Sequence, residues 1–174
     1  MRSIEVSLIL GALFVCASGL SQEKSKEAKI LQALRAGPSG ISMNATVMDW
    51  DGTVLRKGGS DWTCYPGPPH MPDSPMCFDA VWSKWAPAWA EKKPFKTDKV
   101  GIAYMMMGDN GGSNTDPYAE GPTADNEWVV EGPHLMILVP DEKQLEGLPD
   151  DPDTGGPYVM WKGTPYAHIM VPIY

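Results

Sequence analysis

The chain has 174 residues, and its 22 acidic against 14 basic residues give a formal net charge of -8. That length suits one domain and is too short for a TIM barrel. The hydrophobic fraction of 43% is ordinary for a globular protein and argues against wholesale disorder. Because no cluster of Lys and Arg exceeds two neighbours, we expect neither nucleic acid nor an anionic membrane surface as a partner.

Residues 1–21 have the pattern of a secretory signal peptide. Arg2 precedes an apolar stretch over 6–15, and small residues up to Ser21 offer cleavage sites. An uncleaved anchor is the alternative, but the stretch is short for a bilayer, and bulky residues before Cys16 argue against a lipoprotein. We therefore expect a periplasmic or secreted protein that is not inserted in a membrane after signal cleavage.

Export leaves two cysteines, Cys64 and Cys77, in the mature chain. In an oxidising compartment such a pair is most simply a disulfide. A redox or metal-binding thiol pair is the alternative, but the close Cys-x-x-Cys spacing is absent. The sequence therefore predicts a structural disulfide around a segment that prolines keep out of helices and central strands: Pro66, Pro68, Pro69, Pro72 and Pro75.

We divide the mature chain into an N-terminal segment over 22–40 and a single domain over 41–174. Residues 23–35 are charged and helix-prone with a narrow apolar stripe, and Gly37-Pro38 would end a helix there. The N-terminal segment is thus expected to be a short helix or a mobile spacer. No repeat of fixed period is present in the sequence.

Strand patterns dominate the domain. Asp51-Gly52 lies between two of them and is a strong hairpin signal, and Gly163-Thr164 is a second candidate. Several neighbours are joined too tightly for parallel crossovers. We therefore predict the α+β class, with a mainly antiparallel sheet, one or two packed helices and one disulfide. The expected strands cover residues 45–48, 53–56, 62–65, 100–107, 128–131, 134–139, 158–162 and 166–171, and a helical turn covers 141–145.

One longer helix is expected after the disulfide segment. Asp79 is its predicted cap, it runs to about Lys92, and Pro87 should break or kink it. Three tryptophans occur at i, i+3 and i+7 on one face of this helix: Trp82, Trp85 and Trp89. We expect that face to pack on the sheet, and the alternative is an aromatic platform for a sugar or another flat ligand.

The segment Asp49-Trp50-Asp51-Gly52-Thr53-Val54 resembles the first motif of haloacid-dehalogenase-type phosphatases. The resemblance implies a nucleophilic Asp49, an acid/base role for Asp51 and a magnesium site that Gly108-Asp109 would join. The intervening hairpin and proline-rich segment replace the repeated βα units that this fold needs. A hairpin turn is the favoured interpretation, and a small metal-dependent phosphatase-like hydrolase is an alternative function.

Two segments repeat the pattern His-x-Met within predicted strands. His134 and Met136 form one pair, and His168 and Met170 form the other. At a period of two, each His and its Met point to the same face of the sheet. If the strands are neighbours, two imidazoles and two thioethers could converge as a Cu(I) site. The alternative is core packing, with each His bonded to the backbone.

A long polar segment over 108–126 follows the strand at 100–107. Its oxygen-bearing side chains could hold calcium, and a second acidic cluster occurs at 150–153, but neither has the ligand ladder of an EF-hand. Turn chemistry also explains such composition, although long loops inside compact domains are often functional. The candidate ligand-binding residues are Asp109, Asn110, Asn114, Asp116 and Trp128.

Five blocks of the sequence resemble a family of uncharacterised exported bacterial proteins. They cover 61–66, 75–77, 103–109, 132–136 and 155–172. The resemblance extends over most of the chain from about Ala45, and it implies an envelope-side context without any activity or catalytic residue.

The leading functional hypothesis is an exported, non-catalytic binding or accessory protein. Its partner would be an unknown small molecule or an envelope protein, and no cofactor is required, with copper and calcium as candidates. A periplasmic copper-binding protein and the phosphatase-like hydrolase are the alternatives. No catalytic residue is assigned.

Overall fold

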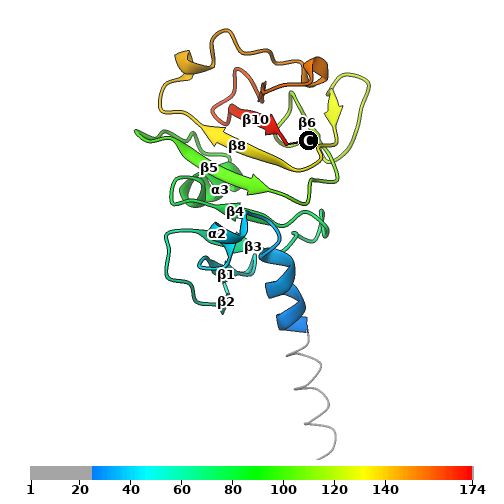
Figure 1. The fold of residues 1–174 in the computed structure, drawn as a ribbon. Helices are drawn as coiled ribbons and strands as arrows, with labels where there is room; N and C mark the ends of the chain where they lie inside the picture. Colours follow the sequence, from blue (N-terminus) through cyan, green and yellow to red (C-terminus); the bar gives the residue numbers. More distant parts are fainter. Residues whose placement is uncertain (1–24, 174) are drawn as a thin grey trace, which may run out of the picture.

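The computed structural model describes residues 25–173 (Figure 1). Its main feature is an eight-stranded sheet in the order β2-β1-β3-β4-β5-β8-β10-β9. Among the described pairings β1 with β3 is parallel and the others are antiparallel. The predicted α+β class and mainly antiparallel sheet are therefore confirmed. The predicted signal peptide lies outside the described residues, and within them no helix is long and apolar enough to cross a bilayer.

The elements are short, as the many Gly and Pro residues predict. The large sheet contains β1 Thr46–Met48, β2 Val54–Arg56, β3 Thr63–Tyr65, β4 Met76–Phe78, β5 Gly101–Met105, β8 His134–Leu138, β9 Tyr158–Met160 and β10 His168–Pro172. A second sheet pairs β6 Gly112–Ser113 with β7 Trp128–Val129. Helical elements are residues 25–33, α2 Ser39–Ser42, α3 Trp82–Ala90, and the 3-10 turns η1 Glu142–Leu145 and η2 Pro152–Thr154.

The predicted hairpin at Asp51-Gly52 joins β1 to β2, which pair antiparallel. Gly52 has φ +86°, a left-handed conformation that costs glycine little. The Asp51 carboxylate accepts the Thr53 N–H at 2.8 Å, which is the local bond expected of Asp in a turn. Turn chemistry alone thus accounts for Asp51 and Gly52.

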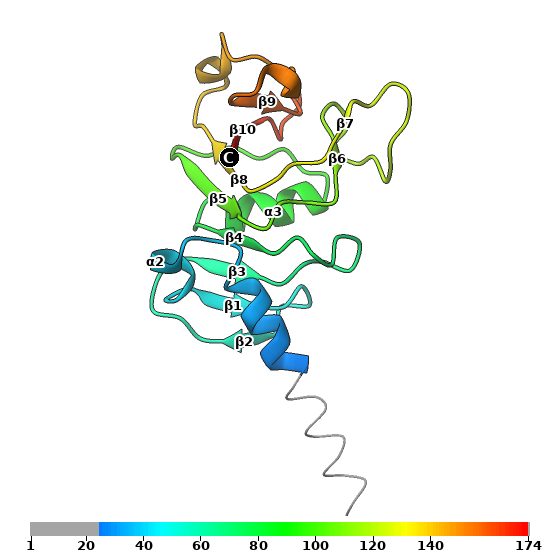
Figure 2. The same cartoon turned by 45° about the vertical axis from the view of Figure 1, so that its right-hand side comes forward.

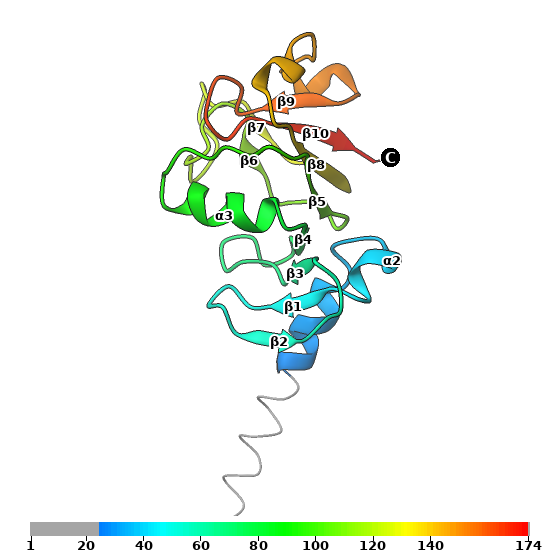
Figure 3. The ribbon, with the colours of Figure 1, turned by 90° about the vertical axis from the view of Figure 1, so that its left-hand side faces the viewer.

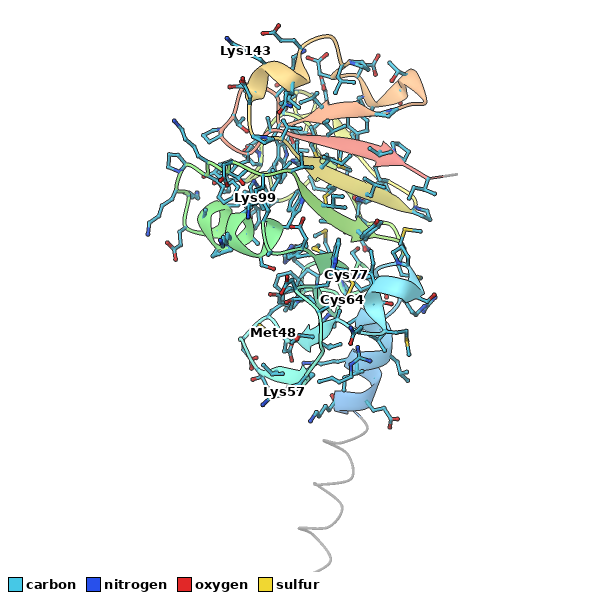
Figure 4. All side chains as sticks on the ribbon, turned by 60° about the vertical axis from the view of Figure 1, so that its left-hand side comes forward. Met48, Lys57, Cys64, Cys77, Lys99 and Lys143 are labelled. Atoms are coloured by element: carbon cyan, nitrogen blue, oxygen red, sulfur yellow. A yellow bond between two sulfur atoms is a disulfide. The ribbon has the colours of Figure 1, made fainter. Side chains whose placement is uncertain are left out.

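The disulfide between Cys64 and Cys77 is present and joins residues directly opposite each other on β3 and β4 (Figure 4). The helix over 25–33 packs on this side of the sheet, on the face opposite to α3 (Figure 3). The buried side chains of this smaller core are Ala33, Ala36, Ala45, Val47, Cys64 and Cys77. The described part of the N-terminal segment is thus packed against the domain.

Helix α3 covers the other face of the sheet (Figures 2 and 3). Asp79 orders its start, because one carboxylate oxygen accepts the N–H groups of Val81 and Trp82 and the other accepts that of Ile102 on β5. Pro87 lies within the helix. The expected packing of the tryptophan face is confirmed by the larger core, whose buried residues are Phe78, Trp82, Trp85, Ala103, Met105, Met136, Leu138, Tyr158, Met160, Tyr166 and Met170.

The structure adds elements that the patterns did not predict. Strand β4 lies near the middle of the sheet, and β6 interrupts the segment 108–126 that was expected to be a loop. The expected two-residue turn at Gly163-Thr164 is instead a longer connection over 161–167. That connection starts with Trp161 at φ +58°, an unusual conformation for a bulky residue.

Candidate functional site

An open cavity of about 840 Å³ lies between the β6–β7 sheet and the segment that carries η2. Two predicted ligand-binding residues, Asn114 and Trp128, line it. The other lining residues are Thr115, Glu127, Val129, Val130, Asp150, Asp151, Pro152, Asp153, Val159 and Lys162. The acidic cluster at 150–153 and the long polar segment therefore meet at one place, although they are distant in sequence.

Asn114 connects the two sides of this cavity. Its side-chain amide donates to Glu127 Oε2 at 3.0 Å and to the Asp150 carbonyl at 2.7 Å. The backbone carbonyl of Asn114 accepts the backbone N–H of Trp161 at 2.8 Å. The residue is 3% exposed, and its Oδ1 has no hydrogen-bond partner among the described residues. A single buried amide thus fixes how the cavity walls lie relative to each other.

The charge of the cavity wall is negative. Four carboxylates line it, and the one lining ammonium, on Lys162, bonds the Asp150 carboxylate at 2.9 Å. That hydrogen bond lowers the pKa of Asp150 below its ordinary value. Within residues 25–173, no three His, Cys, Asp or Glu side chains gather as a metal-binding group. Three of the four carboxylates belong to the segment 150–153, and the fourth is that of Glu127 beside β7, so both sides of the cavity contribute negative charge.

Three predicted ligand-binding residues do not line the cavity and have local roles. Asp109 accepts the N–H groups of Gly111 and Glu131, and burial raises its pKa. Asn110 Oδ1 accepts the Ser74 hydroxyl at 2.9 Å. Asp116 accepts the Tyr118 N–H at 2.9 Å, as a turn residue does. These contacts order the polar segment that supports the cavity.

The two His-x-Met strands are neighbours, and all four side chains lie on one buried face of the sheet. Met136 is directly opposite Met170, whereas Pro172 is opposite His134. Continuing this register, His168 lies four residues beyond the position opposite His134, a strand distance of about 14 Å. The two strands are neighbours, as the copper hypothesis requires. However, the two histidines lie at opposite ends of the Met136–Met170 pair, so they do not approach one another.

Each imidazole is held by its Nδ1. His134 Nδ1 donates to the Gly132 carbonyl at 2.8 Å, and His168 Nδ1 donates to the Tyr166 carbonyl at 3.0 Å. Because a carbonyl only accepts, Nδ1 carries the hydrogen in each ring, and in a neutral imidazole the opposite nitrogen then carries a lone pair. Both Nε2 atoms are buried, and neither has a hydrogen-bond partner among the described residues. Burial lowers the pKa of His168 to about 4.

Indole rings surround His168. Its ring centroid lies 5.0 Å from Trp161, 5.5 Å from Trp82 and 6.1 Å from Trp85, with edge-to-face geometry in each case. Trp161 is fixed in turn, since its Nε1–H donates to the Ser113 carbonyl at 2.7 Å. Trp89 lies parallel to Trp161 and is half-buried. Trp82, Trp85 and Trp161 therefore surround the ring of His168, and Trp89 stacks on Trp161 behind it.

The carboxylates of the phosphatase-like motif lie apart from that of Asp109. Asp49 forms an ion pair with Lys29, and Asp51 caps its own turn. Asp109 follows β5, which is three strand positions from β1 and hence about 14 Å away across the sheet. The motif is therefore part of a hairpin.

Comparison of the chain with protein-family models, with curated proteins and with solved structures finds no match. The family resemblance of the sequence blocks remains an expectation.

Proposed function

We propose that this protein is an exported, non-catalytic binding protein that takes an organic cation in the cavity beside Trp128. The observation that carries the proposal is the composition of the wall. Four carboxylates face one ammonium that is already paired with Asp150, and an indole lies among them. An uncompensated negative wall attracts a cation, and an aromatic ring favours a cation over its face.

The size of the cavity suits a small molecule. Its volume of about 840 Å³ falls in the range of ligand-binding clefts, roughly 300 to 1,000 Å³. Trp128 and the valines beside it provide apolar contact, while the acidic side chains set the preferred charge. A flexible cation with methylene segments between its charges matches both features, and spermidine is such a molecule.

The fixed position of the walls also supports binding. Asn114 holds Glu127 and the Asp150 backbone before any ligand arrives. Preorganisation of this kind reduces the entropy that a ligand must lose on binding. Export is supported by the signal-peptide pattern of residues 1–21 and by the disulfide, because such bonds persist in oxidising compartments.

Calorimetric titration of the disulfide-bonded protein with spermidine tests the proposal. We expect binding that weakens as salt is added, and none for glutamate or glucose. A variant with both Asp151→Asn and Asp153→Asn should lose about tenfold in affinity, roughly 1.4 kcal/mol. The matched control combines Asp61→Asn with Asp98→Asn, which removes two exposed carboxylates outside the cavity and should bind as the wild type does. Equal losses in the cavity variant and the control, or no spermidine binding, would overturn the proposal.

A further inference from the structure

His168 keeps a nitrogen lone pair in the interior of the protein. Its side chain is 1% exposed, and its Nδ1–H is used by the Tyr166 carbonyl. The lone pair on Nε2 has no hydrogen-bond partner within the described chain. A buried acceptor without a donor destabilises a fold, so such an atom calls for a physical explanation.

Two methionines share the face of His168. Met160 is its direct partner across β9 and β10, and Met170 lies two residues further along β10. Cross-strand partners have Cβ atoms about 4.5–5.5 Å apart, and residues at i and i+2 are about 7 Å apart. Met160 is 6% exposed and Met170 is 2% exposed. Unbranched methionine side chains can therefore direct their sulfur atoms toward Nε2 without leaving the core.

The indole rings around His168 add a third kind of contact. Trp82, Trp85 and Trp161 all approach its ring. An aromatic face attracts a cation, and the attraction is larger where water is excluded. Trp161 is half-buried and forms one side of the group of indoles around His168. Its backbone is left-handed, a conformation that is unfavourable for a bulky residue, so the surrounding turn must hold it in place.

We propose that His168, Met160 and Met170 form a binding site for one Cu(I) ion beneath the rings of Trp82, Trp85 and Trp161. One imidazole nitrogen and two thioether sulfurs are soft, uncharged donors, and Cu(I) is the biological ion that prefers them. A single positive charge costs less to bury than a divalent one, and an indole that presents its face to the ion would offset part of that cost.

His134 has a similar lone pair but different surroundings. Met105 on β5 is its direct partner, and Met136 lies two residues along β8. Three indoles approach the ring of His168. The indole enclosure therefore assigns the ion to His168, and Met136 and Met105 become matched controls on the same face of the sheet.

Anaerobic titration with Cu(I), with bicinchoninate as the competing chelator, tests the assignment. We expect one Cu(I) per chain and quenching of tryptophan fluorescence on binding. Met160→Leu and Met170→Leu should each weaken Cu(I) binding by about tenfold or more, because each removes one sulfur at nearly constant volume. Met105→Leu and Met136→Leu should stay within about twofold of the wild type. X-ray absorption should show sulfur and nitrogen neighbours of copper.

Several results would overturn the site. They are a wild type that takes no Cu(I) from the chelator, a Met136→Leu variant that loses as much affinity as Met170→Leu, or a Met160→Leu variant that loses none. His168→Ala should bind no Cu(I), and circular dichroism must show that it folds; if it does not, the methionine variants decide. Spermidine binding should be unchanged in Met160→Leu, so the cavity and the copper site succeed or fail separately.

Discussion

Cys64 and Cys77 are direct partners on β3 and β4, and their bond closes the proline-rich segment between them. Removing the bond should destabilise the protein by about 3 kcal/mol, since a loop of this length gains that much freedom in the unfolded chain. Urea unfolding of the Cys64→Ser, Cys77→Ser variant measures the loss. Thiol titration of the unfolded, non-reduced wild type should find no free thiol in the mature protein, and two reactive thiols would contradict the prediction.

The stability of the metal-free protein should fall between pH 6.5 and pH 4 through His168. Its folded-state pKa of about 4 is below the ordinary value of 6.5, so the unfolded chain binds the proton more readily. The stability from this group is therefore complete above pH 6.5 and is lost as the pH falls toward 4, by up to about 3 kcal/mol. His168→Leu should remove this component, which urea unfolding across the pH range will show. Identical slopes for the two proteins would contradict the prediction.

Asp79 should contribute measurably to stability, because it bonds the start of α3 and the backbone of Ile102 at once. Asp79→Ala leaves three N–H groups without this acceptor, and we expect a loss of about 1–2 kcal/mol in urea unfolding. Glu91→Gln, an exposed change at the other end of the helix, is the control and should have little effect. If Asp79→Ala lost no more stability than Glu91→Gln, water would have replaced the carboxylate as the acceptor, and the prediction would be wrong.

Gly111 should be far less replaceable than Gly112. A Cβ on Gly111 would lie 2.2 Å from Trp128 Nε1, and its φ is +106°, whereas nothing lies within 4 Å of a Cβ on Gly112. Gly111→Ala should therefore shift Trp128, weaken spermidine binding and cost about 1–3 kcal/mol. Gly112→Ala should keep the affinity. Tryptophan fluorescence and the same calorimetric titration compare the two variants. Equal spermidine affinities and equal fluorescence would show that Trp128 can move aside without loss, and would contradict the prediction.

Short-range patterns predicted much of this fold. Asp51-Gly52 determines its hairpin locally, and Asp79 with the tryptophan spacing locates α3, because turn and cap preferences act within a few residues. Strand β4 was missed because its three residues lie between Pro75 and Asp79, too few to show alternation. Strand β6 was missed because Gly112 and Ser113 carry no apolar pattern.

The candidate sites bring together residues that are far apart in the sequence, so their meeting could not be predicted from the sequence. Asn114 and Trp128 were predicted from the polar segment that contains or adjoins them, yet their meeting with Asp150 depends on a hydrogen bond across 36 residues. A period of two placed each histidine on the same face as its own methionine, but it could not fix whether His134 and His168 share a face or how their strands are aligned. The pairing of β8 with β10 places Met136 opposite Met170, and the pairing of β9 with β10 places Met160 opposite His168.

The two cores on opposite faces of the sheet depend on different kinds of force. The core under α3 buries indoles, a phenyl ring and methionines, while the core under the helix over 25–33 buries small side chains and the disulfide. Apolar burial scales with area, so the smaller core gains less from it and more from the covalent link. Reduction should then loosen the helix over 25–33 while the aromatic core persists, which makes complete folding conditional on the redox state of the compartment.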